Sequence, residues 1–167
     1  MPLTVRQISQ RTHIAFDPCR HVVRFLACDG LLHCLNAHAR RSRVYWLTTA
    51  GETARIQLAK SDNAEHTKEA TPDISWELYG WVCYRHRSAI LRALSEPLQP
   101  AVIKRRARSR DPTLRMSANN VRDVIRLFRA RGIVQAVRVR RSAHPRYELT
   151  AIGHLLRTVL LQAEVST

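Results

Sequence analysis

The chain has 167 residues, of which 45% are hydrophobic and 25% charged, and this globular composition excludes disorder over its whole length. Lys and Arg number 28 against 13 Asp and Glu, and the resulting formal net charge of +15 favours a polyanionic partner, nucleic acid before an anionic membrane surface. No stretch reaches the ~18 uninterrupted apolar residues of a membrane-spanning helix, and the first seven residues lack the apolar core of a secretory signal.

The chain is expected to begin with two helices. A short helix covers 5–11, with Val5 and Ile8 facing inward and Ile14 as a further candidate for the inner face. A longer helix starts at Asp17-Pro18, because both residue types suit the first turn of a helix, and Gly30 stands where glycine commonly ends one. Four apolar residues recur at helical spacing along it: Val22, Val23, Phe25 and Leu26.

A hairpin, a third helix and a linker follow. Strands at 31–35 and 44–47 flank the polar, basic segment 36–43, and Thr48 or Thr49 then caps a helix. Acidic residues collect between Lys60 and Trp76, so this stretch predicts a solvated linker.

The second half repeats this order with an additional helix in front. Ser117 is expected to cap the helix over 118–131, and Gly132 to end that helix. In chain order the elements are helices over 79–94, 101–107 and 118–131, strands over 133–139 and 146–149, and a final helix from Thr150 to about Glu164.

The two halves share an internal spacing that indicates a duplication. Each has a helix-ending glycine, a tyrosine 15 residues later and a further glycine after a threonine, all at a constant offset of 102 residues. Pro2-Leu3 corresponds to Pro97-Leu98 at an offset of 95, so the second half carries seven additional residues. The paired positions are Gly30 and Gly132, Tyr45 and Tyr147, and Gly51 and Gly153.

This order of elements is typical of a winged helix-turn-helix. Residues 121–153, with VRDVIRLFRARGIV before a basic hairpin and RYELTAIG after it, resemble the recognition helix and wing of prokaryotic transcription regulators of the MarR and ArsR types. The segments VVRFLACDGLL and RVYWLTTAGE are similar. The resemblance implies a mainly α fold with small β-hairpin wings, in two tandem winged-helix domains at 1–60 and 76–167 joined by an acidic linker at 61–75.

Two features predict an additional contact within or between chains. The first half lacks a counterpart of the helix at 79–94, so another segment, a partner chain or an upstream start is needed to cover its core. The final helix carries more apolar surface than a small domain readily hides, on Leu155, Leu156, Val159, Leu160 and Val165. We expect this helix to pack across the first half or against a second copy, forming a homodimer, or to pack only on its own domain.

Basic residues are concentrated where a winged helix contacts DNA. Half of the positive charge, fourteen Lys and Arg residues, lies between Lys104 and Arg146. Arginine neutralises phosphates and reads guanine, and the asparagine amide reads adenine. The candidate DNA-binding residues are Arg20, His21, Arg24, Arg40, Arg41, Arg43, Lys104, Arg105, Arg106, Arg108, Arg115, Ser117, Asn119, Asn120, Arg122, Arg126, Arg138, Arg140, Arg141, His144 and Arg146.

The sequence offers little for metal binding or catalysis. Cys19, Cys28, Cys34 and Cys83 are expected to be reduced thiols, with Cys28 and Cys34 as small core residues. Together with His21, His33 and His38 the first three lack the regular pair spacing of structural zinc, so we expect no metal and no cofactor. Catalytic triads, paired carboxylates, phosphate loops and dinucleotide fingerprints are also missing from the sequence, which argues against an enzyme.

The sequence therefore predicts sequence-specific binding of double-stranded DNA by a transcription regulator in the cytoplasm, at the nucleoid and without a membrane partner. Two alternatives stay open. One is an architectural protein that coats DNA without sequence preference, which would not lose affinity selectively when Asn119 or Arg122 is changed. The other is a winged-helix adaptor that binds RNA or protein, which competition between duplex DNA and structured RNA would reveal.

Overall fold

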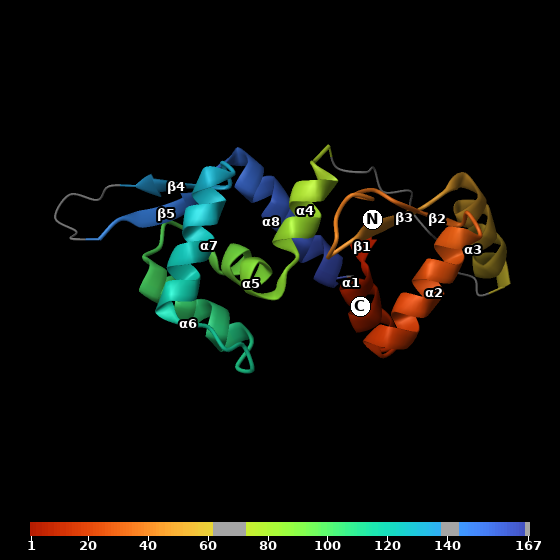
Figure 1. Ribbon diagram of the computed structural model, residues 1–167, viewed down its shortest axis with the longest axis horizontal. Helices are drawn as coiled ribbons and strands as arrows, with labels where there is room; N and C mark the ends of the chain where they lie inside the picture. Colours follow the sequence, from red (N-terminus) through yellow and green to blue (C-terminus); the bar gives the residue numbers. More distant parts are fainter. Residues whose placement is uncertain (62–72, 138–143, 166–167) are drawn as a thin grey trace. The chain divides into compact units, whose positions relative to one another are not determined.

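The computed structural model describes residues 1–61, 73–137 and 144–165 and shows a mainly α protein with small antiparallel sheets (Figure 1). The chain forms two compact units, one of Met1–Trp81 with Ala163–Thr167 and the other of Val82–Gln162. The predicted fold class is confirmed at this level. None of the described helices is long and apolar enough to span a membrane.

The first unit opens with a capped helix. The Thr4 hydroxyl accepts a hydrogen bond from the Gln7 backbone N–H (3.3 Å) and the Gln7 side chain accepts one from the Thr4 N–H (2.8 Å), so both orphan donors of the helix start are satisfied. Its elements are β1 (Leu3–Thr4), α1 (Val5–Thr12), α2 (Phe16–Cys28), β2 (Leu32–Cys34), β3 (Val44–Leu47), α3 (Thr49–Ser61) and α4 (Trp76–Val82) as far as Trp81.

A small sheet and two helices enclose the core of this unit. The strands lie in the order β1-β3-β2, all antiparallel, with Leu3 opposite Tyr45 and Leu32 opposite Leu47. Cys19 and Val23 of α2 and Tyr45 of β3 are buried together, and α1 and β2 pack around them. The predicted short helix, longer helix and hairpin are therefore all present.

Helix α4 supplies the cover that the first unit lacks in sequence. Tyr79 is fully buried and its hydroxyl accepts a hydrogen bond from Gln7 Nε2 at 2.9 Å. Gly80 lies so close to the buried Asn36 that a Cβ there would overlap the Asn36 amide. Asn36 in turn donates to the Ser42 carbonyl (3.3 Å) and accepts from the Val44 N–H (2.8 Å). A segment later in the chain thus takes the place of a preceding helix.

The end of the last helix also belongs to the first unit. Arg11 Nε on α1 donates to the Ala163 carbonyl at 2.7 Å. The sequence predicts that the apolar surface of this helix packs against another surface. Three of its side chains are buried within the chain itself, namely Leu156, Val159 and Leu160. Among the described side chains of this helix, the large apolar ones that stay exposed are Ile152 and Leu155, and the side chain of Val165 lies outside the described part.

The second unit is a helical core with a two-stranded hairpin. The single helix predicted over 79–94 is instead two helices, because the helical conformation is interrupted between Val82 and Arg85. The first of them, α4, belongs to the first unit as far as Trp81. Ile90, Leu91, Ile103 and Phe128 are almost completely buried between its helices. The elements are α5 (Arg85–Ala93), α6 (Pro100–Arg110), α7 (Ala118–Ala130), β4 (Val134–Val137), β5 (Arg146–Leu149) and α8 (Ala151–Val165).

The paired positions of the two halves have the same local geometry. Gly30 and Gly132 both end a 13-residue helix with positive φ, 72° and 67°, which is the conformation that favours glycine. The Thr48 hydroxyl donates to the Gly30 carbonyl at 2.6 Å, and the Thr150 hydroxyl donates to the Gly132 carbonyl at 2.5 Å. The strand pairing Leu3–Tyr45 also has its equivalent in the bridge between Leu98 and Tyr147.

Removing the Tyr79 hydroxyl tests the role of α4. Tyr79→Phe leaves the buried Gln7 amide without this acceptor, and an unsatisfied buried donor costs about 1–3 kcal/mol. We expect urea unfolding to show a decrease of that size in the free energy of unfolding. Tyr84→Phe is the matched control, because Tyr84 is 43% exposed and its loss should stay within about 0.5 kcal/mol. Equal losses in the two variants would contradict this role.

Candidate nucleic-acid interface

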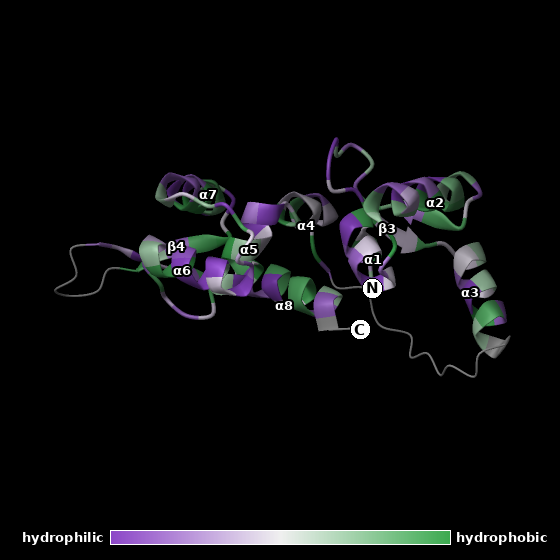
Figure 2. Ribbon diagram, turned by 90° about the horizontal axis from the view of Figure 1, so that it is seen from below, coloured by the Kyte–Doolittle hydropathy of each residue, from purple (hydrophilic) through white to green (hydrophobic). Residues whose placement is uncertain are grey.

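Helix α7 separates an apolar inner face from a polar outer face. Val121, Val124, Ile125 and Phe128 are buried against the unit, while the positions between them are exposed. The same alternation of apolar and polar residues is visible along the ribbon in Figure 2. The outer face therefore presents its polar and charged residues to solvent, in the order Asn119, Arg122, Asp123, Arg126 and Arg129.

The start of α7 uses one of its two asparagines as a cap. Asn120 Oδ1 accepts hydrogen bonds from the Ser117 N–H (2.9 Å) and hydroxyl (2.8 Å), and the Asn120 N–H donates to Ser117 Oγ (3.1 Å). Reading adenine requires the same amide oxygen as an acceptor. Ser117 and Asn120, both candidate DNA contacts by sequence, are thus engaged in holding the helix start.

Two pairs of side chains order the outer face of α7. Arg122 Nη1 donates to Asn119 Oδ1 at 3.1 Å, and Arg126 Nη1 lies 3.3 Å from Asp123 Oδ1. Both pairs join residues three apart, the spacing that brings helix side chains together. The second pair is highly exposed, so water screens it and it restrains Arg126 only weakly.

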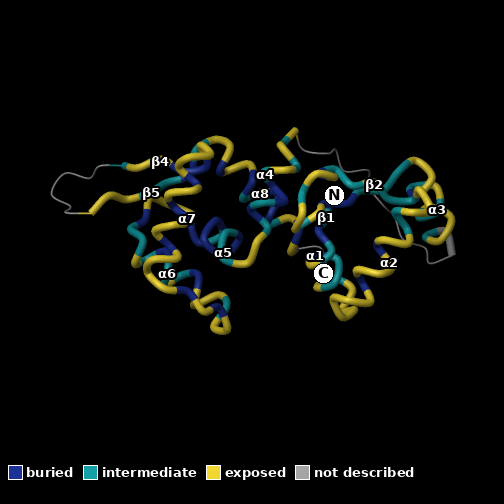
Figure 3. The backbone as a smooth tube through the Cα atoms, in the orientation of Figure 1, coloured by how far each residue is buried: buried dark blue, intermediate teal, exposed yellow. Residues whose placement is uncertain are grey.

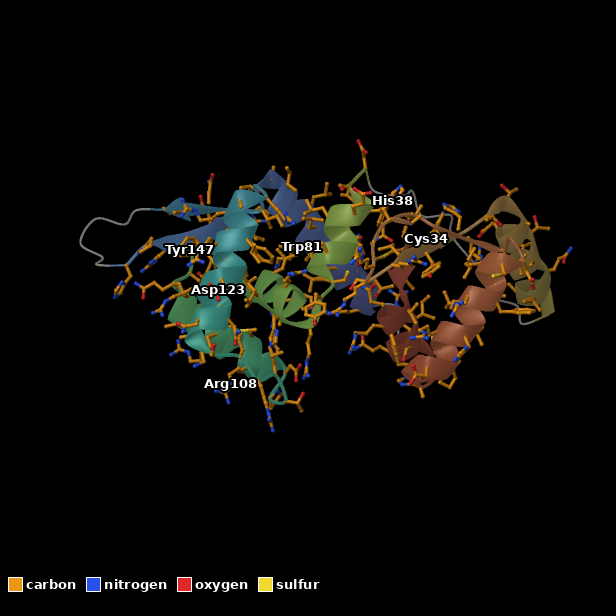
Figure 4. The ribbon with its side chains drawn as sticks, viewed as in Figure 1. Cys34, His38, Trp81, Arg108, Asp123 and Tyr147 are labelled. Atoms are coloured by element: carbon orange, nitrogen blue, oxygen red, sulfur yellow. The ribbon has the colours of Figure 1, made fainter. Side chains whose placement is uncertain are left out.

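Helix α6 presents three of the cations predicted from sequence. Arg105 and Arg108 are exposed and Lys104 is half-buried, and their side chains make no ion pair or hydrogen bond with residues of 1–61, 73–137 or 144–165. Figure 4 shows the labelled Arg108 on α6 and Asp123 on α7. Arg106 differs, because it pairs with Glu96 and donates to Ser95 Oγ at 3.0 Å. Its positive charge is therefore partly neutralised by Glu96 within the unit.

The loop between α6 and α7 is fastened to α5. Arg85 Nη2 donates to Thr113 Oγ1 at 2.6 Å and lies 3.1 Å from Asp111 Oδ2, and His86 Nε2 contacts the Arg115 carbonyl at 2.9 Å. Hydrogen bonds from Thr113 and then Arg85 lower the pKa of Asp111, so its carboxylate stays charged at neutral pH. These contacts set the direction in which α7 leaves the loop.

Sequence reasoning missed two groups at this surface. Arg85 and His86 position the loop across more than 25 residues of sequence, and nothing in the local pattern marks them. Arg129, in contrast, is exposed three residues after Arg126 and seven after Arg122. Helical spacing alone would have placed it on the same face.

The predicted wing of the second unit is described in part. Strands β4 and β5 pair from Val134–Leu149 to Val137–Arg146, and the Gln135 amide donates to Glu148 at 2.7 Å across the hairpin. Arg146 and His144 are exposed beside the loop. The remaining wing candidates, Arg138, Arg140 and Arg141, lie outside the described residues.

The first unit carries fewer cations at the equivalent positions. Arg20, His21 and Arg24 are exposed on α2, but α1 has Ser9 and Gln10 where α6 has Lys104 and Arg105. The predicted wing residues Arg40, Arg41 and Arg43 are also exposed, and the Arg43 Nε donates to the Ala39 carbonyl at 3.1 Å.

The cysteines and histidines of the first unit do not converge. No group of three or more His, Cys, Asp or Glu side chains in the described part of the chain is placed to hold a metal ion. Cys19 is buried, and burial raises the pKa of its thiol. The expectation that Cys28 is a core residue is wrong, because Cys28 is exposed at the end of α2, one residue after Ala27, which packs against the core. Cys34 is half-buried and its Sγ donates to Asn36 Oδ1 at 3.6 Å.

These environments predict an order of thiol modification. We expect iodoacetamide to alkylate Cys28 well before Cys19, because Cys28 is exposed whereas Cys19 is buried with a raised pKa and little thiolate. Peptide mass mapping after short exposures at neutral pH measures this order. Early modification of Cys19 in the folded chain would contradict it, and alkylation in urea is the control in which both thiols react.

Comparison with known proteins gives a distant structural likeness and no sequence family. No protein-family model matches the chain, and no curated protein matches it. A solved structure described as "Structure of GAS PerR-Zn-Zn" is similar at 12% identity and a TM-score of 0.32. The likeness covers 57% of this chain and 51% of that chain, so this chain spans about half of that protein. A TM-score of this size does not establish a shared fold.

Proposed function

We propose that this protein binds double-stranded DNA sequence-specifically through α6 and α7 and acts as a transcription regulator without catalysis. The observation that carries the proposal is the outer face of α7, where Arg122, Arg126 and Arg129 are exposed to solvent opposite a buried apolar stripe. Arg105 and Arg108 of α6 add exposed charge beside it. A helix of this kind suits the major groove, with the preceding helix against the backbone.

We further propose that both units are winged helices that arose by duplication. The shared helix lengths, the two glycines with positive φ and the two threonine hydrogen bonds support an equivalence at the offset of 102 residues. The hairpins β2–β3 and β4–β5 are the wings in this proposal. It makes the first unit a second, less basic module on the same chain.

Selection of bound sequences from a random duplex pool tests the function directly. Enrichment of a defined motif is expected, and the absence of any enriched motif would contradict sequence-specific binding. Arg122→Ala should then cost about 1–3 kcal/mol on the selected sequence and less on random duplex, because a bidentate arginine discriminates by that amount. Arg55→Ala is the matched control, since it removes the same charge from α3 and leaves α7 intact.

One observation favours the architectural alternative. Asn120 is engaged in the cap and Asn119 is held by Arg122, which leaves arginines as the main groups facing a duplex. A protein that only coats DNA would lose affinity equally for all sequences when Arg122 is changed. Competition between duplex DNA and structured RNA in the same assay separates the third option, an adaptor for RNA or protein.

A further inference from the structure

Both asparagines at the start of α7 have an engaged amide oxygen. Arg122 Nη1 donates to Asn119 Oδ1 at 3.1 Å. Asn120 Oδ1 accepts hydrogen bonds from the Ser117 N–H at 2.9 Å and from its hydroxyl at 2.8 Å. Because a guanidinium and a backbone N–H only donate, the oxygen and not the nitrogen of each amide must face these partners. A base that needs an amide oxygen as acceptor therefore meets one that is occupied at either residue.

The charged groups of α7 are three arginines and one aspartate. Arg122, Arg126 and Arg129 are exposed at intervals of four and three residues, so they lie along one face of the helix. Figure 3 shows exposed and buried residues alternating along α7. Asp123 Oδ1 lies 3.3 Å from Arg126 Nη1, so its carboxylate is partly neutralised by a neighbouring guanidinium. The outer face therefore offers a ligand mainly N–H donors.

Base edges in the major groove differ in their hydrogen-bond acceptors. Guanine presents two, N7 and O6, whereas adenine presents an acceptor beside a donor, thymine an acceptor beside a methyl group, and cytosine a donor. The bond to Asn119 uses Nη1 of Arg122, which leaves the parallel N–H groups of Nε and Nη2 on the other edge of the guanidinium. This pair of donors matches guanine. Adenine and cytosine would each bring a further donor to a surface whose acceptors are engaged.

The contact with Asn119 also restrains the direction of these donors. The two residues are three apart on the helix, so the hydrogen bond holds the long Arg122 side chain along the outer face. Ordering a long side chain during binding lowers affinity, and a side chain that is held beforehand loses less. At the offset of 102 residues the first unit has the same order of an acceptor and an arginine, with Asp17 three residues before Arg20.

We infer that Asn119 is a positioning residue, which directs the Arg122 guanidinium to read a guanine in the major groove of the bound duplex. The inference rests on the proposed function and adds to it the base that α7 selects and the residue that enforces this choice. It also replaces the contact with adenine that the sequence predicts for the Asn119 amide. Asn119 then acts on specificity through Arg122 and not through a base of its own.

The test compares duplexes that differ in one base pair of the motif selected from a random pool, with the full chain. Arg122→Ala identifies the base that Arg122 contacts. We expect a guanine, whose preference over adenine falls by about 5–150-fold in this variant. Asn119→Ala keeps Arg122 but releases it, and should lower the preference for the same guanine by about 2–10-fold. Because this change removes no charge, the dependence of affinity on salt should stay as in the wild-type chain.

Asn119→Asp separates positioning from direct contact with a base. The carboxylate keeps an acceptor for Arg122 but lacks the NH2 group of the amide, so the preference for guanine should stay within about twofold of the wild-type value. The added negative charge lowers affinity for both duplexes alike and cancels in their ratio. Asp123→Asn is the matched control, since it changes the residue next to Arg122 without altering the bond to Asn119. It should also keep the preference within about twofold.

A guanine preference that Asn119→Ala leaves unchanged, or that Asn119→Asp lowers as much as Asn119→Ala does, overturns the inference. The same holds for an adenine preference that is lost in Asn119→Ala, and for a loss in Asp123→Asn equal to that in Asn119→Ala. A base other than guanine that depends on Arg122, or no base that depends on it, also overturns the inference. In each of these cases a motif is still enriched, so the proposed function stands. Enrichment of no motif overturns the proposed function, and the inference with it.

Discussion

Replacing Lys104, Arg105 and Arg108 together by glutamine is expected to weaken binding to every duplex by roughly 10²–10³-fold at 0.1 M salt. Each phosphate contact that is lost removes about 0.9 from the slope of log affinity against log salt, so three contacts remove about 2.7. The three side chains have no ion pair within the described residues, and their removal therefore leaves the fold of α6 intact. Fluorescence anisotropy across a salt series gives both the affinity and the slope.

The matched control removes the same charge from the first unit. Arg40, Arg41 and Arg43 are exposed, and their replacement by glutamine lowers the net charge by the same amount. If the second unit makes most of the phosphate contacts, this variant keeps most of the salt slope. A slope that falls equally in both variants would mean that overall charge, rather than the surface of α6 and α7, governs binding.

Gly153→Ala is expected to destabilise the second unit by about 1–3 kcal/mol, the usual cost of forcing additional volume into a packed site. A Cβ at this position would overlap the Ile133 carbonyl oxygen, which also accepts the Thr150 N–H. The direction of this change in stability is the opposite of the usual one. Alanine in place of glycine in an ordinary helix stabilises it by about 1 kcal/mol.

Gly51→Ala provides the same change in the first unit. Its Cβ would overlap the Leu31 carbonyl oxygen in the same way, so the destabilisation should be similar but located elsewhere. Amide exchange resolves which unit opens in each variant, and duplex affinity should fall for Gly153→Ala much more than for Gly51→Ala. A gain of stability in either variant would contradict the close approach of helix and strand.

Local signals carried most of the secondary structure. Gly30 and Gly132 end their helices as expected, and the Ser117 cap and the hairpin at Tyr45 follow from residue type and spacing alone. The same rules placed Arg122 and Arg126 on the outer face of α7. These features depend on contacts between residues that are close in sequence, which a pattern can record.

Contacts distant in sequence explain what the pattern did not predict. Tyr79 and Gln7 are 72 residues apart, and their hydrogen bond assigns α4 to the first unit instead of to a long helix of the second. Val22 follows the helical period of a core residue, yet it is 54% exposed within the described structure. Asn120 has the residue type and position of a base-reading side chain. Its Oδ1 instead accepts a hydrogen bond from the Ser117 N–H at the start of the helix.

The position of α4 in the chain has a consequence for how the protein is made. Translation releases α1, α2, the sheet and α3 before the segment that closes over them, and at about 5–20 residues per second roughly one to four seconds pass between Ser61 and Val82. During that interval the nascent first unit exposes the surface that Tyr79 later covers. Its maturation on the ribosome therefore waits for residues that lie beyond its own sheet, and chaperones meet an incomplete intermediate rather than a finished N-terminal domain.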